Sequence, residues 1–332
     1  MKECTGTGKQ GTDRLQVSID DKAGAARPLV SIVLATYNPR MDWLKEQLDS
    51  LNDQSYDSLE LIVLDDCSNK VSFEEIHACI EECITRIPFE VFRNEVNTGS
   101  TKAFEKLTTL AKGEYIAYCD QDDVWREDKI ETLIGCFIED KINLVYSDVQ
   151  LINERGEITA DSITALRKRH LLYEGSGLAE KLLIKNFVIG CTMLIKSDVA
   201  KSSLPFIMEM VHDHYLALIA SIDGEFALYK NPLVFYRIHE ENQTNTLTRV
   251  KNKKDYYNYK IQEFLDRILQ LEKRNINEKV PEFSSIREWA KARTAYYNGD
   301  VTQAKTIWKY RLLDYNISLF ELVMLKMPDF IF

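Results

Sequence analysis

The chain alternates short apolar runs of strand length with longer segments that have the apolar spacing of helices. Five such runs fall at 29–35, 59–65, 89–93, 115–119 and 143–147, and helix-like segments lie between them near 41–53, 73–84, 100–111 and 127–139. Four of the five runs lack the strict alternation of apolar and polar residues that is typical of a strand with one solvent-exposed face, so they are predicted to be buried. This order predicts an α/β fold with a mainly parallel central sheet.

Polar residues follow the carboxyl ends of four of these runs. They read TYN at 36–38, DDCSN at 65–69, NTG at 97–99 and DQDD at 120–123. Asn, Asp, Ser and Gly also form turns and helix caps, so each cluster alone is more typical of a turn than of a ligand contact. In parallel sheets, however, ligands bind beyond the carboxyl ends of the strands. Four clusters at one edge together favour a ligand-binding cleft.

The composition argues against several classes of protein. Among 332 residues, 42 Lys and Arg stand against 52 Asp and Glu, and the net charge of -10 disfavours sequence-independent nucleic-acid binding as the main task. The seven cysteines contain no CxxC pair, which indicates neither a disulfide framework nor a zinc site and favours a reducing compartment. No window approaches the ~20 apolar residues of a membrane-spanning helix. We therefore expect a cytoplasmic protein, with peripheral contact to the inner face of the plasma membrane left open.

The pattern changes twice along the chain. Residues 1–27 are polar and lack apolar periodicity, so they are predicted to be a flexible leader. The α/β domain is expected over 28–245, and a helical C-terminal region over 246–332. The α/β domain continues with a basic irregular stretch at 160–185 and a further predicted strand at 190–196. A predicted helix at 212–221 and two strand-like runs within 225–237 follow.

Three carboxylates, Asp120, Asp122 and Asp123, crowd the end of the fourth apolar run. Like charges this close repel one another unless a cation, a helix N-terminus or water shares their field. The stretch resembles the opening of a calcium-binding EF-hand loop, but Trp125 stands where that loop needs glycine, and a strand precedes it. The alternative is that Asp123 caps a helix that begins near Arg126, which accounts for one of the three carboxylates.

Beyond these patterns, the chain resembles the family 2 glycosyltransferases, which are inverting enzymes with the GT-A fold. The resemblance covers about 29–245 and rests on the order of VSIVLATYN, LIVLDDCSN, NTGSTKAFEKL, YIAYCDQDDVW, GCTMLIKSDVA, HDHYLALIAS and LVFYRIHEENQTN. It implies a Rossmann-like domain that binds a nucleotide sugar. It also implies that a DXD element, here Asp120, Gln121 and Asp122 with Asp123 following, holds Mg²⁺ or Mn²⁺ against the donor diphosphate.

The resemblance also assigns roles around the nucleotide. Asp120 would face the ribose, and the metal ligand would be Asp122 or Asp123. Asp66 would accept a hydrogen bond from a pyrimidine N–H, with Asp65 beside it or serving only as a loop acid. The other residues expected near the nucleotide are Thr36, Tyr37, Asn38, Gly99, Lys102 and Gln121.

Two further residues are expected near the reacting groups. The family places its general base before an amphipathic helix, which here implies Asp213, and the alternative is that this residue only caps the helix. An inverting transfer needs a base opposite the leaving group, where it takes the proton of the attacking hydroxyl. His239 matches a position near the diphosphate and metal, with Arg237 nearby, or else is structural.

The motifs are most similar to the rhamnosyltransferase-like branch, which builds bacterial cell-surface polysaccharides. This implies transfer of L-rhamnose from dTDP-L-rhamnose to a hydroxyl of a glycan or of its lipid-linked precursor. Another UDP- or dTDP-sugar is the alternative donor. A non-catalytic module that binds nucleotide sugars or glycans is the alternative class, disfavoured because Asp66, Asp120, Asp122 and Asp213 are all present.

The helical C-terminal region has several interpretations. It could form a homodimer, dock a partner enzyme, lie on a membrane through the apolar end at 319–332, or pack onto the core, which is the most frequent outcome. The sequence NGD at 298–300 is predicted to end one helix and cap the next.

Overall fold

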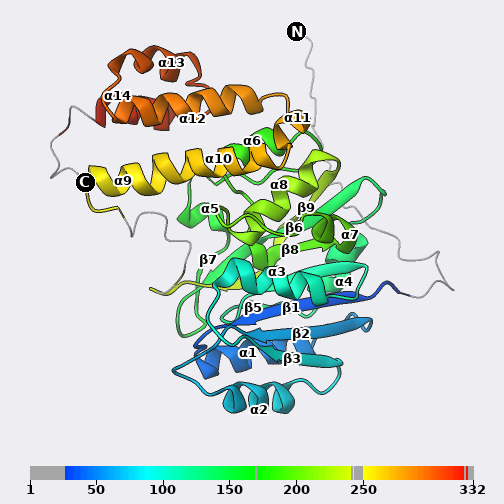
Figure 1. The fold of residues 1–332 in the computed structure, drawn as a ribbon. Coiled ribbons are helices and arrows are strands. Elements are labelled where there is room, and N and C mark those ends of the chain that lie inside the picture. Colours follow the sequence, from blue (N-terminus) through cyan, green and yellow to red (C-terminus); the bar gives the residue numbers. More distant parts are fainter. Residues whose placement is uncertain (1–26, 169, 241, 243–249, 325–326, 328–332) are drawn as a thin grey trace, which may run out of the picture.

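The computed structural model describes residues 27–168, 170–240, 242, 250–324 and 327. The predicted leader lies outside this part except for Arg27, and so do the domain boundary at 245 and most residues after Met324. Within the described part, a curled sheet of nine strands lies between two layers of helices, and C-terminal helices stack onto one of these layers (Figure 1).

Seven of the nine strands of the described part occur where the sequence predicted them. The nine are β1 (Val30–Thr36), β2 (Leu59–Asp65), β3 (Phe89–Arg93), β4 (Tyr115–Cys119), β5 (Val124–Trp125), β6 (Ile142–Ile152), β7 (Ile158–Ala160), β8 (Met193–Lys196) and β9 (Glu225–Arg237). The short strands β5 and β7 were not predicted. Their order is β3-β2-β1-β4-β8-β6-β9-β5, and β7 pairs with β6. β3, β2, β1 and β4 pair in parallel, as do β6 and β9, while β8 runs antiparallel between β4 and β6. The predicted mainly parallel sheet is confirmed.

Helices cover both faces of the sheet because each has an apolar side. The helices are α1 (Met41–Asn52), α2 (Phe73–Cys83), α3 (Ser100–Leu110), α4 (Lys129–Gly135), α5 (Ile163–Leu166), α6 (Ala179–Ile184), α7 (Ser197–Ser202), α8 (His212–Ile222), α9 (Lys253–Tyr256), α10 (Glu263–Lys273), α11 (Ile276–Lys279), α12 (Phe283–Tyr297), α13 (Ala304–Lys309) and α14 (Tyr315–Met324). Leucines and isoleucines of α1, α2 and α4 fill the core on one face. On the other face, α3, α6 and α8 do the same.

Two segments differ from their sequence predictions. The two strand-like runs at 225–237 form one strand, β9, whose pairing jumps from Tyr229 opposite Ser147 to Val234 opposite Val149. Residues 230–233, which include Pro232, bulge out of the ladder there, because proline cannot donate to it. The predicted strand at 190–196 begins with a 3-10 turn, Gly190–Thr192, before β8. The NGD prediction is confirmed, since α12 ends at Tyr297 and Asp300 accepts a hydrogen bond from Thr302 N.

The C-terminal helices pack onto the α/β core. Phe264, Ile268 and Trp289 of α10 and α12 belong to the same buried cluster as α3, α6 and α8. Arg267 donates to the carbonyl oxygens of Leu183 and Ile184, which joins α10 to the end of α6. Core packing is therefore the interpretation that the described part of this region supports. None of the described helices is both long and apolar enough to cross a membrane.

A buried ion pair joins the last two long helices. The guanidinium of Arg293 on α12 donates to both carboxylate oxygens of Glu321 on α14, at 2.7 and 2.6 Å. The Tyr256 hydroxyl donates to the same carboxylate at 3.0 Å. Both charged side chains are 2% exposed, so the pair is isolated from water and each partner depends on the other.

Candidate active site

A cleft of about 500 Å³ opens beyond the carboxyl ends of β1, β2 and β4. Ten of the residues predicted from the sequence line it: Thr36, Tyr37, Asn38, Asp66, Gly99, Asp120, Gln121, Asp122, Asp213 and His239. Three predicted residues, Asp65, Lys102 and Asp123, are not among the described residues that line it. The edge of the sheet thus brings most of the predicted set into one cavity.

The backbone after β1 is held by side chains from neighbouring loops. Gln121 accepts a hydrogen bond from Tyr37 N at 2.8 Å and donates to Tyr37 O at 3.3 Å, while the Tyr37 side chain remains exposed at the cleft. The carbonyl oxygen of the Asn38 side chain accepts from Asn69 N and Lys70 N, each at 2.8 Å. The buried Thr36 hydroxyl has no hydrogen-bond partner among the described residues, so a bound ligand could supply one.

Asp66 organises the loop that precedes α3. Its carboxylate accepts from Asn94 Nδ2, Thr98 N, the Thr98 hydroxyl and Gly99 N, at 2.7 to 3.0 Å. Gly99, the N-cap residue of α3, has φ +83°, a conformation that glycine adopts without strain. These four donors occupy the carboxylate, so a ligand N–H could reach it only if a donor such as the rotatable Thr98 hydroxyl turned away.

The neighbouring acid and the predicted lysine have other partners. Asp65 is fully buried and accepts from Ser68 N and the Ser68 hydroxyl, and it lies 3.3 Å from Arg93 Nε. This arrangement matches the loop-acid alternative. Lys102 pairs with Glu105 at 2.8 Å on the surface of α3. The cation that does line the cleft is Lys70, which the sequence analysis did not single out.

Asp122 and His239 form the part of the cleft best suited to a divalent cation. Asp122 Oδ2 lies 2.8 Å from His239 Nε2, and both side chains line the cleft. Nearby, burial and the charges of Asp122 and Asp213 raise the pKa of Asp120 to about 7. This excess of negative charge, together with carboxylate and imidazole ligands, fits Mg²⁺ or Mn²⁺.

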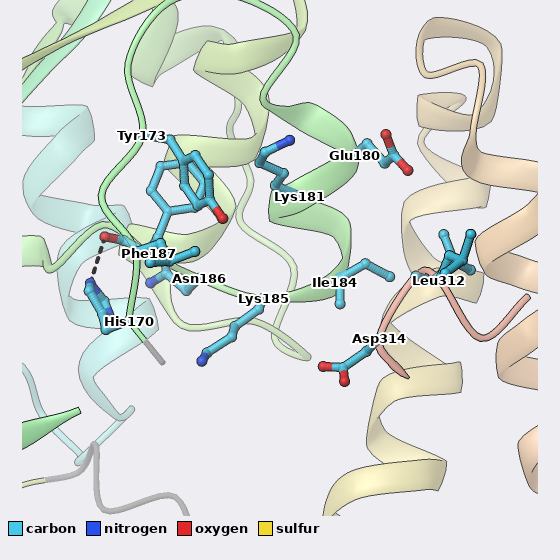
Figure 2. A pocket seen from close by; sticks show the side chains of 12 residues that line it. His170, Tyr173, Glu180, Lys181, Ile184, Lys185, Asn186, Phe187, Leu312 and Asp314 are labelled. Carbon is cyan, nitrogen blue, oxygen red and sulfur yellow. Dashed lines mark hydrogen bonds between the residues drawn. The ribbon is translucent and has the colours of Figure 1, made fainter. Parts of the chain in front are cut away.

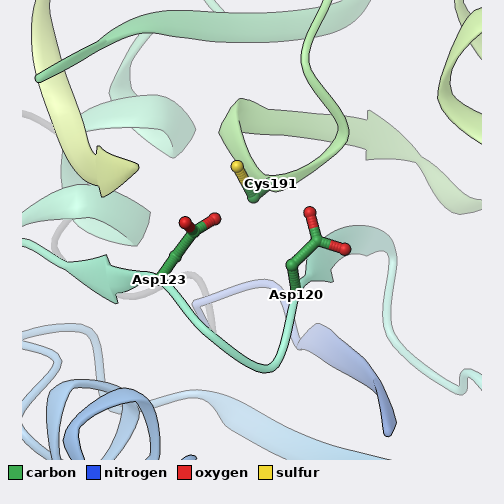
Figure 3. Close-up of side chains that lie close together, drawn as sticks. All are labelled: Asp120, Asp123 and Cys191. Carbon is green, nitrogen blue, oxygen red and sulfur yellow. The ribbon is translucent and has the colours of Figure 1, made fainter. Parts of the chain in front are cut away.

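Asp123 points away from this pair. Its side chain and that of Asp120 approach Cys191, with one potential ligand atom from each within 4.8 Å of the others (Figure 3). Asp123 is fully buried and accepts from Arg237 N at 2.9 Å. A thiol is a soft ligand that Mg²⁺ and Mn²⁺ do not prefer, so this group fits a structural role better than a metal site.

The capping alternative for Asp123 is wrong, because α4 begins only at Lys129 and its N-cap residue is Asp128. The fully buried Lys129 donates to Cys191 O at 2.6 Å and places positive charge near Asp123 and Asp120. Burial lowers the pKa of Lys129 to about 7. The acid pair and this lysine therefore form a compact charged group beneath the cleft.

Asp213 lies in the first turn of α8, two residues after the N-cap residue Val211. Its carboxylate accepts from His214 N at 2.5 Å and from Gly190 N at 3.1 Å. Burial raises the pKa of Asp213 to about 6, and the bonds from these two amides and from the Asn186 side chain oppose this rise. A half-buried acid with such a pKa, open to the cleft, is suited to accept a proton near neutral pH.

The comparisons with known proteins decide the family. The family model described as "Glycosyl transferase family 2" matches residues 31–204, which is more than half of the chain. The chain belongs to glycosyl transferase family 2. It is 29% identical over 237 residues to an uncharacterized glycosyltransferase of Methanocaldococcus jannaschii, a match that covers 70% of this chain and 78% of that protein. It is 26% identical over 238 residues to the dTDP-rhamnosyl transferase RfbG of Shigella flexneri, which covers 66% and 76% of the two chains.

A solved structure confirms the predicted GT-A fold of this glycosyltransferase. The mannosyltransferase PcManGT from Pyrobaculum calidifontis, in complex with GDP-Man and Mn²⁺, is similar with a TM-score of 0.53 at 17% sequence identity. The similarity covers 90% of this chain and 84% of that chain. At this level of identity the similarity establishes the fold.

Several residues that line the cleft were missed by the sequence analysis. They are Lys70, Ser100, Phe104, Ile189, Gly190, Tyr236 and Asn242. Lys70 adjoins the polar cluster at 65–69 that the sequence already marked, so extending this cluster by one residue would have found it. His212 stacks on Phe104 with ring centroids 3.9 Å apart, a contact that joins residues far apart in the sequence and leaves no local signal.

The Asn186 side chain acts on the protonation of Asp213 in this glycosyltransferase, since it opposes the rise in pKa that burial causes. Its Oδ1 accepts from Val188 N at 3.0 Å, which leaves the amide NH₂ to donate to Asp213. We predict that Asn186→Ala raises the pKa of Asp213, because the ionised form loses a donor. A base must be deprotonated, so the pH below which transfer falls should move upward from about 6. A pH profile of the transfer rate measures this, and an unchanged acid limb would contradict it.

Proposed function

We propose that this family 2 glycosyltransferase moves a sugar from a pyrimidine-nucleotide donor to a hydroxyl of a glycan or of its lipid-linked precursor, with L-rhamnose from dTDP-L-rhamnose as the favoured donor. The observation that carries the proposal is the opening of the Asp122–His239 pair and of Asp213 onto one cleft. The Asp122–His239 pair can hold a metal ion beside a diphosphate, and Asp213 can accept a proton. These are the two requirements of an inverting transfer.

Different residues of the cleft have different roles in the proposed reaction. The N-terminus of α3, which opens at Gly99 and Ser100, directs backbone N–H groups and the positive end of a helix dipole at the cleft, and Lys70 adds a positive charge. Asp213 takes the proton of the acceptor hydroxyl as that oxygen attacks the anomeric carbon. A divalent ion held by Asp122 and His239 would supply positive charge against the departing diphosphate.

Divalent metal should control donor binding. We expect Asp122→Ala to lower the affinity for the nucleotide sugar by about 10²-fold, because the diphosphate would then face Asp120 without a compensating cation. Calorimetry with Mg²⁺, with Mn²⁺ and with EDTA measures the effect. The matched control is Asp128→Ala, which removes the same charge from an acid paired with Arg126. Equal affinity of the wild-type protein in EDTA would remove the metal from the proposal.

The donor nucleotide is expected to be dTDP or UDP. Similarity to the dTDP-rhamnosyl transferase RfbG supports a pyrimidine, and the exposed Tyr37 would crowd a larger purine. The similar mannosyltransferase is in complex with GDP-Man, so the fold alone does not select the base. Competition by free dTDP, UDP and GDP against a panel of nucleotide sugars tests this. Stronger inhibition by GDP than by both pyrimidine nucleotides would contradict it.

A further inference from the structure

A second cavity, of about 360 Å³, lies between the α/β core and the C-terminal helices. One wall is α6 with the residues that follow it, and a second is the stretch at 170–173 (Figure 2). The third is the loop at 312–314 that joins α13 to α14. The cavity is therefore built jointly by the basic irregular segment at 160–185 and by the C-terminal region, and the described residues of these two segments do not line the donor cleft.

The lining combines cationic and apolar groups. Lys181 and Lys185 extend from α6 and the residue that follows it (Figure 2), and the lining also includes Leu171 and Leu312, which are 57% and 84% exposed. Glu180 and Asp314 also line the cavity, and Asp314 accepts from Ile317 N at the start of α14. Lysines can bind an anionic group, and exposed leucines beside them can contact a hydrocarbon chain. The cavity therefore suits a ligand that has both parts.

Arg167 acts electrostatically on His170 of the cavity and on Asp213 of the donor cleft. Burial lowers the pKa of His170, and the charges of Arg167 and Lys185 lower it further. His170 lines the cavity, and its Nε2 lies 3.1 Å from Phe187 O. The charge of Arg167 also acts on Asp213. Arg167 therefore lies within electrostatic reach of both His170 and Asp213. It belongs to the basic segment at 160–185, which has no role in the proposed reaction.

The cavity reaches the base through a short piece of chain. Asn186 and Phe187 line it, and Ile189 and Gly190, three residues further on, line the donor cleft. Four residues of extended chain span at most about 14 Å. Asn186 itself lines the cavity, and its side chain lowers the pKa of Asp213, so this residue lies near both the cavity and the proposed base.

The surface beside the cavity mouth is aromatic and basic. Trp308 and Tyr315 are 44% and 48% exposed, and they flank the loop that carries Leu312. Arg311 lies over the Trp308 ring at 4.6 Å, and Lys309 lies over the Tyr310 ring at 4.7 Å. Tryptophan and tyrosine beside basic side chains are typical of surfaces that meet the headgroup layer of a membrane.

We propose that this second cavity binds the phosphate end of a prenyl phosphate- or diphosphate-linked acceptor, with its phosphates at Lys181 and Lys185, its hydrocarbon chain across Leu171 and Leu312, and its glycan directed toward Asp213. The inference rests on the proposed function and adds to it the place and chemistry of acceptor binding. The acceptor hydroxyl and the donor would then approach Asp213 from two different cavities, which keeps the lipid clear of the nucleotide.

The test uses farnesyl diphosphate as the probe. Binding is measured by calorimetry on the full chain carrying Asp122→Ala, in EDTA, so that a metal in the donor cleft cannot hold the diphosphate. We expect saturable binding that Lys181→Glu with Lys185→Glu weakens by about tenfold, and that Leu312→Asp weakens by several-fold. Lys230→Glu with Lys254→Glu, the same charge change at two exposed lysines elsewhere, should leave affinity within about twofold. Melting temperatures confirm folding, and Lys181→Gln with Lys185→Gln serves as the milder pair.

Two further probes separate the parts of the ligand. Inorganic pyrophosphate and farnesol should each bind more weakly than farnesyl diphosphate, because each lacks one half of the recognised structure. The proposal is overturned if either binds as tightly, or if both folded lysine pairs bind farnesyl diphosphate as wild type does. Donor binding by the lysine pairs in an otherwise wild-type chain with Mn²⁺ should be unchanged, so failure of this inference is distinguishable from failure of the proposed donor site.

Discussion

Asp213→Asn is expected to lower the transfer rate by about 10²- to 10⁴-fold, the usual cost of losing a general base. Asparagine has nearly the same shape but cannot accept the proton of the acceptor hydroxyl. Donor affinity should stay within about twofold, since the Asp122–His239 pair and the residues around Tyr37 are untouched. Transfer to a matched acceptor, donor calorimetry and thermal melting, each compared with wild type, measure the three properties.

The stability of this variant distinguishes a base from a structural residue. The pKa of Asp213 is raised from 3.8 to about 6, so its ionisation in the fold costs stability, and this cost grows between these pH values and is complete above about 6. Asparagine removes that cost but presents an NH₂ group to the donors at Gly190 or His214. The effects oppose each other, and at pH 8 we expect a melting temperature within a few degrees of wild type.

His212 provides the matched control for the base. It lines the same cleft next to Asp213, but burial lowers its pKa to about 3, which makes it a weak proton acceptor. His212→Gln should therefore retain far more transfer than Asp213→Asn. If Asp213→Asn transfers within a few-fold of wild type, the proton is taken elsewhere and the proposed mechanism is wrong.

Removing Glu321 is expected to destabilise the protein by about 3 to 5 kcal/mol, the usual cost of breaking a buried ion pair from one side. In Glu321→Ala the Arg293 guanidinium stays buried without its carboxylate, and the Tyr256 hydroxyl loses its acceptor. Urea unfolding followed by circular dichroism measures the change in the free energy of unfolding. Lys309→Ala, an exposed change on the neighbouring α13, is the control and should alter it by less than about 0.5 kcal/mol.

A double replacement tests the reason for that loss. Arg293→Met with Glu321→Leu removes both charges and keeps most of the buried volume, so much of the lost stability should return. If the double variant is as unstable as Glu321→Ala, packing of α14 rather than the unpaired charge causes the loss.

The sequence predicted the strands and the cleft well because both follow from local pattern. Parallel strands buried on both faces are continuous apolar runs, and the residues after β1, β2 and β4 meet at one edge whatever the rest of the chain does. The antiparallel position of β8 between β4 and β6 was not predictable, since the four residues of β8 carry no sign of their neighbours. Pairing of this kind is decided by tertiary packing.

Individual side chains were harder to predict for the same reason. Asp122 and Asp123 are adjacent in sequence, yet the first opens to the cleft and the second turns inward to Arg237 N. Asp65 and Asp66 divide in the same way, one bonded to Ser68 within its own loop and the other to the loop before α3. Asp122 lies in a turn and Asp65 ends β2, and at such positions neighbouring side chains face different surroundings, so only the fold shows which member of each pair meets the cleft.

The buried Arg237 has a consequence for how donor binding is coupled to folding. Its backbone N–H donates to Asp123, its Nε donates to the carbonyl oxygen of Asp122 at 2.8 Å, and its remaining nitrogens contact Asn153, Glu154 and Glu46. The loop of the acidic cluster is thereby fixed to the end of β9 before any nucleotide arrives. We therefore expect that little conformational entropy is left to lose when the proposed donor site binds its ligand, because the folded chain already holds this loop in place.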